Sequence, residues 1–192
     1  MEREKLYKVF SDIPTLETER LVLRRMRGQD AEDMYEYASR SEVTEFLLWS
    51  EHKSLSYTKE YLKYIESRYS VGDFYDWAVT LKDGGKMIGT CGFAKIDTVN
   101  NSAELGYVLN PSYHKKGIAK EAAEAVIRFG FESLGLNRIE ARFMEGNLPS
   151  LRVMEKLGMN FEGFEREAVF VKGSYKTVGK CALLSKSFFN KE

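Results

Sequence analysis

The sequence of 192 residues has little of several features that define special classes of protein. It contains two cysteines, three prolines and two histidines, and its 29 basic side chains balance its 29 acidic ones. Two cysteines far apart in the chain are too few for a disulfide framework or a metal cluster, and each lies in an apolar run typical of a buried thiol. The histidines do not recur with carboxylates or thiols at metal-ligand spacing, so we expect no metal site. A net charge of zero argues against direct nucleic-acid binding.

Long apolar runs are also missing. No stretch approaches the ~20 apolar residues that cross a bilayer, and the charged start MEREKLYKVF lacks the apolar core of a signal peptide. We therefore expect a cytoplasmic protein that does not bind a membrane. No repeat or low-complexity tract marks a linker, so we expect one domain over residues 15–190 after a short extension over 1–14. A hydrophobic fraction of 43% supplies enough core for it.

Hydrophobic periodicity predicts a mixed succession of strands and helices. The first 13 residues contain one or two amphipathic turns. The predicted strands are 19–26, 75–82, 86–96, 102–109, 138–144, 161–172 and 175–186. The predicted helices are 28–40, one from 56 or 58 to 69, 117–134 and 149–157. This order favours the α+β (mixed α/β) class, with helices on both faces of a mainly antiparallel central sheet and one βαβ crossover over 102–144.

The segment 107–121, YVLNPSYHKKGIAKE, is the most informative part of the chain. It predicts a strand that ends at Asn110-Pro111, a short loop, and then the N-terminus of a long helix. A helix N-terminus has unpaired N–H groups and a positive dipole end, so it binds anions. Gly117 allows close backbone approach, and Ala119 leaves the first turn bare. The three lysines that add positive charge here are Lys115, Lys116 and Lys120.

The ligand predicted for this loop is a pyrophosphate, although two common phosphate motifs are absent. Neither the Walker pattern GxxxxGK[ST] nor the dinucleotide pattern GxGxxG occurs. Taken alone, the segment is explained equally well by a strand–loop–helix joint with solvated lysines.

The same loop resembles the R/Q-x-x-G-x-G/A pyrophosphate loop of the GNAT (GCN-five-related) N-acetyltransferases. Gly117 and Ala119 occupy its last two signature positions, and His114 stands where Arg or Gln is usual. The Rim-type branch, which acetylates ribosomal-protein N-termini, often has an aromatic residue there. Three further segments resemble that branch in the right order: LETERLVLR at 16–24, AELGY at 103–107, and NLPS at 147–150 followed by EKLGM at 155–159. The similarity spans about 15–186.

The resemblance implies that acetyl-CoA binds in a cleft where the strands 102–109 and 138–144 splay apart. Backbone amides around Val108 to Asn110 would bond the pantetheine arm and polarise the thioester carbonyl. The loop from His114 to Ala119 would hold the pyrophosphate, and Asn147 would bond the cofactor's amide groups. The cofactor-binding residues expected on this basis are Val108, Leu109, Asn110, His114, Lys115, Lys116, Gly117, Ile118, Ala119, Asn147 and Ser150.

The implied reaction is direct attack of an amine on the thioester, without a covalent enzyme intermediate. The amine must first lose a proton, and Glu104 is the carboxylate expected to help; a solvated strand residue is the alternative. Many relatives protonate the leaving thiolate with a Tyr, at whose position Met154 stands here. The Rim-type branch implies Ser150 instead, and a helix-capping hydroxyl is the alternative for it. Tyr107 is a weaker candidate for the base.

The acceptor side is expected in residues 28–76, which carry five basic and eleven acidic residues. Carboxylates near Trp49 suit a cationic, partly apolar acceptor such as a peptide or protein N-terminus, and a plain solvated face explains them equally well. Trp49 and Tyr107 are the acceptor-binding candidates. Two rival functions remain at this stage: acetylation of a small amine (a polyamine, amino sugar or antibiotic), and a non-catalytic acyl-CoA-binding module. Monomer and homodimer are both left open.

Overall fold

The strands of the chain form one sheet in the order β1-β2-β3-β4-β5-β6-β8-β7. The computed structural model describes residues 2–190. The strands are β1 (Leu16–Glu17), β2 (Leu21–Arg24), β3 (Asp76–Leu81), β4 (Met87–Asp97), β5 (Ser102–Leu109), β6 (Arg138–Met144), β7 (Asn160–Val171) and β8 (Ser174–Leu184). Every pairing is antiparallel except that of β5 with β6. The predicted fold class is confirmed.

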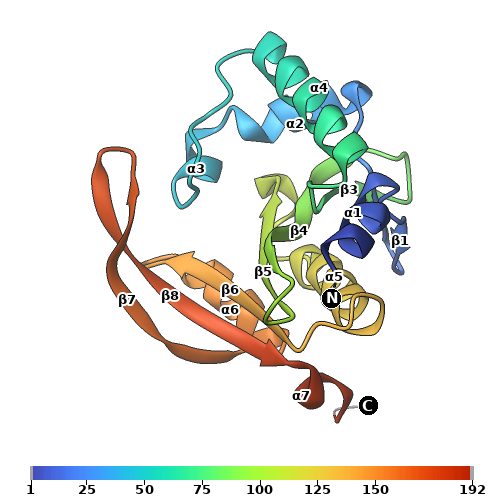
Figure 1. Cartoon of the computed structure of the whole chain (residues 1–192). Coiled ribbons are helices and arrows are strands. Elements are labelled where there is room, and N and C mark those ends of the chain that lie inside the picture. Colours follow the sequence, from blue (N-terminus) through green and yellow to red (C-terminus); the bar gives the residue numbers. More distant parts are fainter. Residues whose placement is uncertain (1, 191–192) are drawn as a thin grey trace.

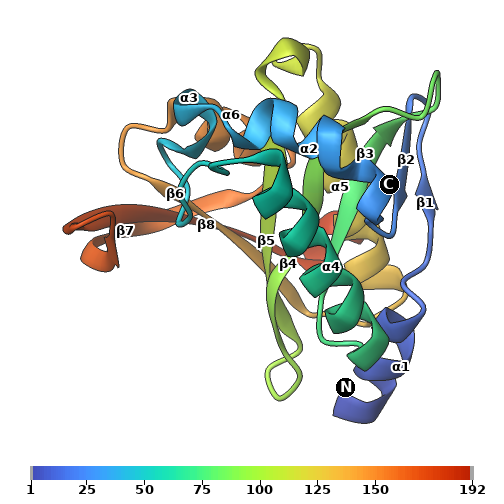
Figure 2. The same cartoon turned by 90° about the horizontal axis from the view of Figure 1, so that it is seen from above.

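Helices cover both faces of this sheet. The α-helices are α1 (Arg3–Ser11), α2 (Ala31–Ala38), α3 (Ser41–Thr44), α4 (Leu55–Val71), α5 (Ile118–Glu132), α6 (Leu148–Lys156) and α7 (Ser185–Phe189), with short 3-10 turns η1 (Gly28–Asp30) and η2 (Pro111–Tyr113). Figure 1 shows α2 and α4 on one side of β3–β5 and α5 on the other. Seen from above, α2 and α4 lie in front of the strands (Figure 2). The long hairpin of β7 and β8 projects away from this central body.

The N-terminal segment expected as an extension packs into the core. In α1, Leu6 and Phe10 are buried, and the Phe10 ring meets the rings of Trp77 and Phe129 edge to face at 5.6 and 6.2 Å between centroids. Such aromatic pairs add to the burial of apolar area, so α1 joins β3 to α5. The predicted amphipathic turns are thus confirmed; residue 1 lies outside the described residues.

Several predicted boundaries differ from the structure. The expected helix over 28–40 is divided into the turn η1 and the helix α2, because the Asp30 carboxylate pairs with Arg24 and accepts a hydrogen bond from the Arg27 amide, which fixes a separate turn. The short helix α3 was not predicted. The helix expected from 56 or 58 begins at Leu55, with Ser54 as its N-cap. The last strand ends at Leu184 because its partner there, Arg138, is the first residue of β6.

Candidate active site

The cleft expected between two strands lies where β5 leaves β6. These strands pair only from Ser102 with Arg138 to Leu105 with Ala141, and beyond this point β6 pairs with β8 alone. The residues Gly106–Leu109 therefore have a neighbour only on the β4 side. A cavity of about 1460 Å³ extends through the gap, larger than the ~300–1,000 Å³ of a typical single-ligand pocket. It has room for a cofactor arm and an acceptor together.

The register of β5 decides which amides face this cleft. The Asn110 amide donates to the Ile88 carbonyl of β4 (2.8 Å), and alternate residues of an antiparallel strand point their amides to the same side. The amide of Val108 therefore faces β4, and those of Tyr107 and Leu109 face the cleft. The expectation that Val108 and Asn110 offer amides to a cofactor is corrected to Tyr107 and Leu109.

Asn110 has a structural role instead. Its side chain is fully buried; Nδ2 donates to Glu36 Oε1 (2.8 Å), and Oδ1 accepts the Ser112 amide (3.0 Å) as the cap of η2. With its polar atoms satisfied in this way, Asn110 ends the strand and starts the loop, and no side-chain atom remains for a ligand. The sequence correctly predicted that Asn110 ends the strand, but its amide bonds β4 and does not face the cofactor cleft.

The predicted pyrophosphate loop has the geometry of an anion site. Gly117 is the N-cap of α5 with φ of 77°, in the left-handed region that glycine favours. The next three amides, from Ile118 to Lys120, precede the first helical hydrogen bond, which runs from Glu121 to Gly117. His114 Nε2 donates to the Leu109 carbonyl (3.0 Å), so this exposed ring closes the loop onto the end of the strand.

The lysines of the loop differ in their surroundings. Lys120 pairs with Glu124 one turn along α5 (2.6 Å), which offsets part of its charge. Lys116 lies over the Tyr113 ring, with 5.2 Å between Nζ and the ring centroid. Lys115 is exposed and adopts a positive φ of 61° beside Gly117. Lys115 and Lys116 therefore supply most of the positive charge at this end of α5.

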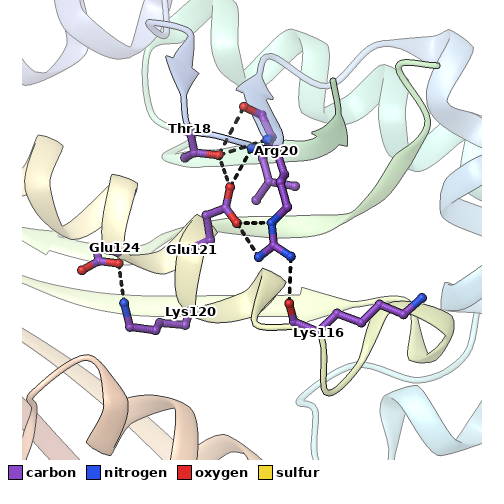
Figure 3. Close-up of polar contacts among 7 residues, drawn as sticks. Thr18, Arg20, Lys116, Lys120, Glu121 and Glu124 are labelled. Carbon is purple, nitrogen blue, oxygen red and sulfur yellow. Dashed lines mark hydrogen bonds and ion pairs between the residues drawn. The ribbon is translucent and has the colours of Figure 1, made fainter. Parts of the chain in front are cut away.

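A network that the sequence did not reveal fixes the loop to the first strands (Figure 3). Glu121 Oε1 accepts hydrogen bonds from the Thr18 hydroxyl (2.5 Å) and the Arg20 amide (2.9 Å), and Oε2 accepts Arg20 Nε (2.7 Å). Arg20 Nη1 in turn donates to the Lys116 carbonyl (2.9 Å). Although burial opposes its charge, the hydrogen bonds from Thr18 and Arg20 lower the pKa of Glu121 below its ordinary value of 4.5. The Glu121 carboxylate thus joins α5 to the segment of Thr18 and Arg20, and Arg20 extends this connection to the loop.

Ser150 and Tyr107 meet at the far side of the cleft. The Tyr107 Oη lies 2.9 Å from Ser150 Oγ and 3.1 Å from the Ser150 carbonyl. Burial raises the pKa of Tyr107 well above its ordinary range, so its phenol stays protonated. Asn147, not Ser150, caps α6, because its side-chain oxygen accepts the Ser150 amide (3.3 Å). The Ser150 hydroxyl is therefore committed to Tyr107 and the cleft.

Glu104 and a group of aromatic side chains that includes Trp49, Tyr57 and Tyr61 line the acceptor half of the cavity. Glu104 Oε2 lies 3.8 Å from Arg142 Nε of β6, so this carboxylate already faces a cation. Trp49 lines the cavity beside the buried His52, whose ring also contacts Tyr57 and Tyr61 at 5.0 and 5.4 Å. His52 and Tyr61 escaped sequence reasoning because they are far from any motif.

The tip of the β7–β8 hairpin meets the segment after α2. Lys172 Nζ donates to the Thr44 carbonyl (2.5 Å), and Phe46 packs against Met144 and Val171. Figure 1 shows the tip of the hairpin beside α3. The acceptor half of the cavity is thereby bounded by two segments far apart in sequence.

Comparison with known proteins assigns the fold and chemistry to a family. A family model described as an acetyltransferase (GNAT) domain matches residues 20–160. The chain belongs to the GNAT acetyltransferases. It is 36% identical over 174 residues to the uncharacterized N-acetyltransferase p20 of Bacillus licheniformis, covering 91% of this chain and 98% of that protein. The chain is therefore an N-acetyltransferase of the GNAT family, whose members use acetyl-CoA.

Solved structures of GNAT proteins agree with this fold. A GNAT-family acetyltransferase from Bacillus anthracis superposes with a TM-score of 0.80 at 29% identity, covering 90% of this chain and 99% of that one. Ribosomal-protein-S5-alanine acetyltransferase from Vibrio fischeri gives 0.77 at 22% identity, covering 91% and 98%. No helix within residues 2–190 is both long and apolar enough to cross a membrane. Those residues also contain no cluster of three His, Cys, Asp or Glu side chains placed to hold a metal ion.

The residues of the cleft suit acetyl-CoA in a GNAT protein. The helix N-terminus with Lys115 and Lys116 fits a pyrophosphate, and the outward amides of Tyr107 and Leu109 fit the polar groups of an extended arm. The amide nitrogen of Asn147 remains for a further hydrogen bond, since its oxygen serves the cap. Acetyl-CoA supplies the activated acetyl group; the chain supplies its binding and orientation.

The Glu121 network predicts a variant that weakens cofactor binding alone. Glu121→Gln removes the charge that joins Thr18 and Arg20 to the loop, so we expect KM for acetyl-CoA to rise roughly three- to ten-fold, with kcat within about two-fold of wild type. Steady-state kinetics against acetyl-CoA measure this. The matched control is Glu132→Gln, which breaks an exposed ion pair with Arg128 at the other end of α5 and should leave KM unchanged; equal effects from both variants would contradict the role of the network.

Proposed function

We propose that this GNAT protein transfers the acetyl group of acetyl-CoA to the α-amine of a peptide or protein N-terminus. The proposal rests on the charges of the acceptor half of the cavity. Four of its carboxylates are engaged: Glu42 with Arg40 (2.6 Å), Asp73 with Arg68 (2.6 Å), Glu104 with Arg142 (3.8 Å), and Glu51 with the Thr44 hydroxyl (3.0 Å). Asp76 takes part in none of the ion pairs among residues 2–190, although it lines the same cavity.

A single unpaired carboxylate favours an acceptor with one positive charge at its reacting end. The walls around it are aromatic and apolar, with Trp49, Tyr61 and Phe74 among the lining residues. An α-ammonium group followed by a small or apolar first side chain matches this arrangement. A polyamine carries charges at repeated intervals and would need further free carboxylates along the cavity. The neighbour in fold from Vibrio fischeri, named for ribosomal-protein alanine acetylation, supports the same acceptor class.

The reaction then needs two contributions from this chain. The amides of Tyr107 and Leu109 stabilise the negative charge that develops on the thioester oxygen as the amine attacks. The Ser150 hydroxyl, held by Tyr107, gives a proton to the departing thiolate and is restored by the proton that the nitrogen loses as it becomes an amide. The acceptor amine must arrive without its proton, since an ammonium nitrogen has no lone pair. No residue forms a covalent bond to the acetyl group.

The experiment that tests the acceptor is a panel of amines with release of free thiol as the readout. Peptides that differ only in their first residue are compared with spermidine and an aminoglycoside, each with acetyl-CoA. We expect peptides with a small first residue to react at least ten-fold faster than either small amine. Reaction with spermidine and with no peptide would contradict the proposal, and the absence of thiol release with every amine of the panel would indicate a non-catalytic module.

A further inference from the structure

Asp76 is a half-buried carboxylate in the acceptor cavity that the reaction as described so far does not use. It starts β3, and since neighbouring residues of a strand face opposite sides, its side chain points into the cavity while Trp77 points into the core. Gly92 of β4 lies directly opposite Asp76, and a Cβ there would come within 2.3 Å of the Asp76 Cα and 2.6 Å of its Oδ1. Glycine at this position therefore lets β3 and β4 approach closely beside the carboxylate.

The surrounding structure holds Asp76 in place. Its carbonyl accepts the Tyr69 hydroxyl (2.5 Å), and its Oδ1 accepts the Trp77 amide (3.1 Å). A hydrogen bond from the Thr90 side chain also reaches the carboxylate. These hydrogen bonds fix the orientation of the carboxylate, and a side chain that binds a single ligand atom must be oriented in this way.

Two glycines clear a path from Asp76 to the cleft. In the register of the sheet, Asp76 pairs with Gly92, and Gly92 pairs with Gly106 of β5. Gly106 is the first residue beyond the last β5–β6 pair, so it marks the point where the strands separate. The row spans two strand spacings of about 4.8 Å, with no side chain on Gly92 or Gly106 to block it. An amine above this row lies between the carboxylate and the Tyr107 amide.

The groups that face Asp76 leave it without a counter-charge. They are Tyr37 of α2 and Tyr61 and Tyr69 of α4; Cys91 of β4 pairs with Trp77 and points to the other face of the sheet. Burial raises the pKa of all four groups, so all are neutral near pH 7. Burial without a cation also raises the pKa of Asp76 from its ordinary 3.8 to about 7. A carboxylate with this pKa accepts a proton near neutral pH and can release it again.

We propose that Asp76 receives the ammonium group of the acceptor and takes its proton, which delivers a neutral amine to the thioester. The ammonium nitrogen and the carboxylate form a pair; one proton moves from nitrogen to Oδ, leaving an amine with its lone pair and a neutral carboxylic acid. After transfer the acid returns the proton to solvent. The inference rests on the proposed function and replaces Glu104 as the expected base, because Glu104 already faces Arg142.

The test compares Asp76→Asn with wild type across pH. Asparagine keeps the size and hydrogen bonds of the side chain but cannot hold a proton from the substrate, so the variant uses only amine that is already neutral. For an α-amine with a pKa near ~8 this is about a tenth of the total at pH 7. We expect kcat/KM of the variant to be about ten-fold below wild type at pH 7 and within about three-fold at pH 9.5. A ratio that stays constant with pH, or a variant equal to wild type at pH 7, overturns the proposal.

A second measurement uses the protein without substrates. Because Asp76 has a raised pKa when folded, the folded wild type binds more protons than the unfolded chain between about pH 4 and 7, and its stability falls as pH rises through that window. Asp76→Asn does not titrate, so its melting temperature should exceed that of wild type by several degrees at pH 8 and match it near pH 4. The control is Asp97→Asn, since amides of Asn100 lower the pKa of that exposed carboxylate and its variant should gain nothing at pH 8. If D76N and wild type have the same melting temperature at both pH values, the Asp76 carboxylate does not have the raised pKa that its burial without a cation implies.

The two proposals fail differently. If the acceptor is a polyamine, with a pKa near ~10, only on the order of a thousandth of it is neutral at pH 7. The loss in D76N with spermidine would then be larger than ten-fold and recover only above pH 10, which would retain Asp76 and discard the peptide acceptor. If peptides are acetylated and the pH profile of kcat/KM is the same for D76N and wild type, the peptide acceptor is retained and the role of Asp76 as the base is rejected.

Discussion

Replacing Ser150 by alanine is expected to lower kcat ten-fold or more while leaving the affinity for acetyl-CoA nearly unchanged. The hydroxyl lies 2.9 Å from the Tyr107 phenol, and both residues line the cleft. Loss of a positioned proton donor removes an interaction made chiefly in the transition state, so kcat falls more than binding. Steady-state kinetics and a titration with acetyl-CoA measure the two quantities.

Two companion variants separate catalysis from helix capping. Tyr107→Phe removes the partner that orients the hydroxyl and should lower kcat by a smaller factor than Ser150→Ala. Asn147→Ala removes the cap of α6 and should cost about 1 kcal/mol of stability. If S150A loses as much stability as N147A and keeps its kcat, the serine is structural and its assignment is wrong.

Replacing Gly117 by alanine is expected to raise KM for acetyl-CoA at least ten-fold, with little change in kcat at saturation. Gly117 has φ of 77°, which an L-residue adopts at a cost of ~1–2 kcal/mol. In the variant we expect the loop to relieve this strain by a change of backbone conformation that turns its amides away from the cofactor phosphates. The Cβ itself would meet only Arg20 Nη2 at 3.5 Å, an ordinary contact. The effect therefore comes from backbone conformation rather than a clash.

Gly135 provides a matched control at the other end of the same helix. It also has a positive φ, of 67°, and a Cβ there would meet nothing within 4 Å. Gly135→Ala should lose a similar amount of stability, about 1 kcal/mol, and keep its KM for acetyl-CoA. Equal KM values for the two variants would show that strain alone, and not the anion site, accounts for G117A.

Local features of this site could be predicted from the sequence. The loop from His114 to Ala119 is a continuous segment whose glycine, lysines and following helix give its chemistry directly, and the separation of β5 from β6 followed from the resemblance to GNAT proteins. The assignment of amides failed at Val108 and Asn110 because it depends on the parity of the β4–β5 register, which composition does not encode.

Features that depend on contacts across the fold were not predictable. Asp76 sits in an unremarkable strand sequence, and its character arises from Gly92 and Gly106 on neighbouring strands and from the aromatic side chains of α2 and α4. Likewise, the contact of Lys172 with Thr44 joins segments 128 residues apart. A single Asp in an otherwise apolar strand was the available signal, and the sheet register is needed to interpret it.

One measurement tests the central claim most directly: the position of the acetyl group on a peptide that has both a free α-amine and a lysine side chain. The peptide is incubated with acetyl-CoA and the protein near pH 7, and fragment masses locate the modification. The account predicts one acetyl group on the α-amine and an unmodified lysine, since the cavity offers one unpaired carboxylate to an amine with a pKa near ~8. Acetylation of the lysine alone, or of neither amine, would contradict it.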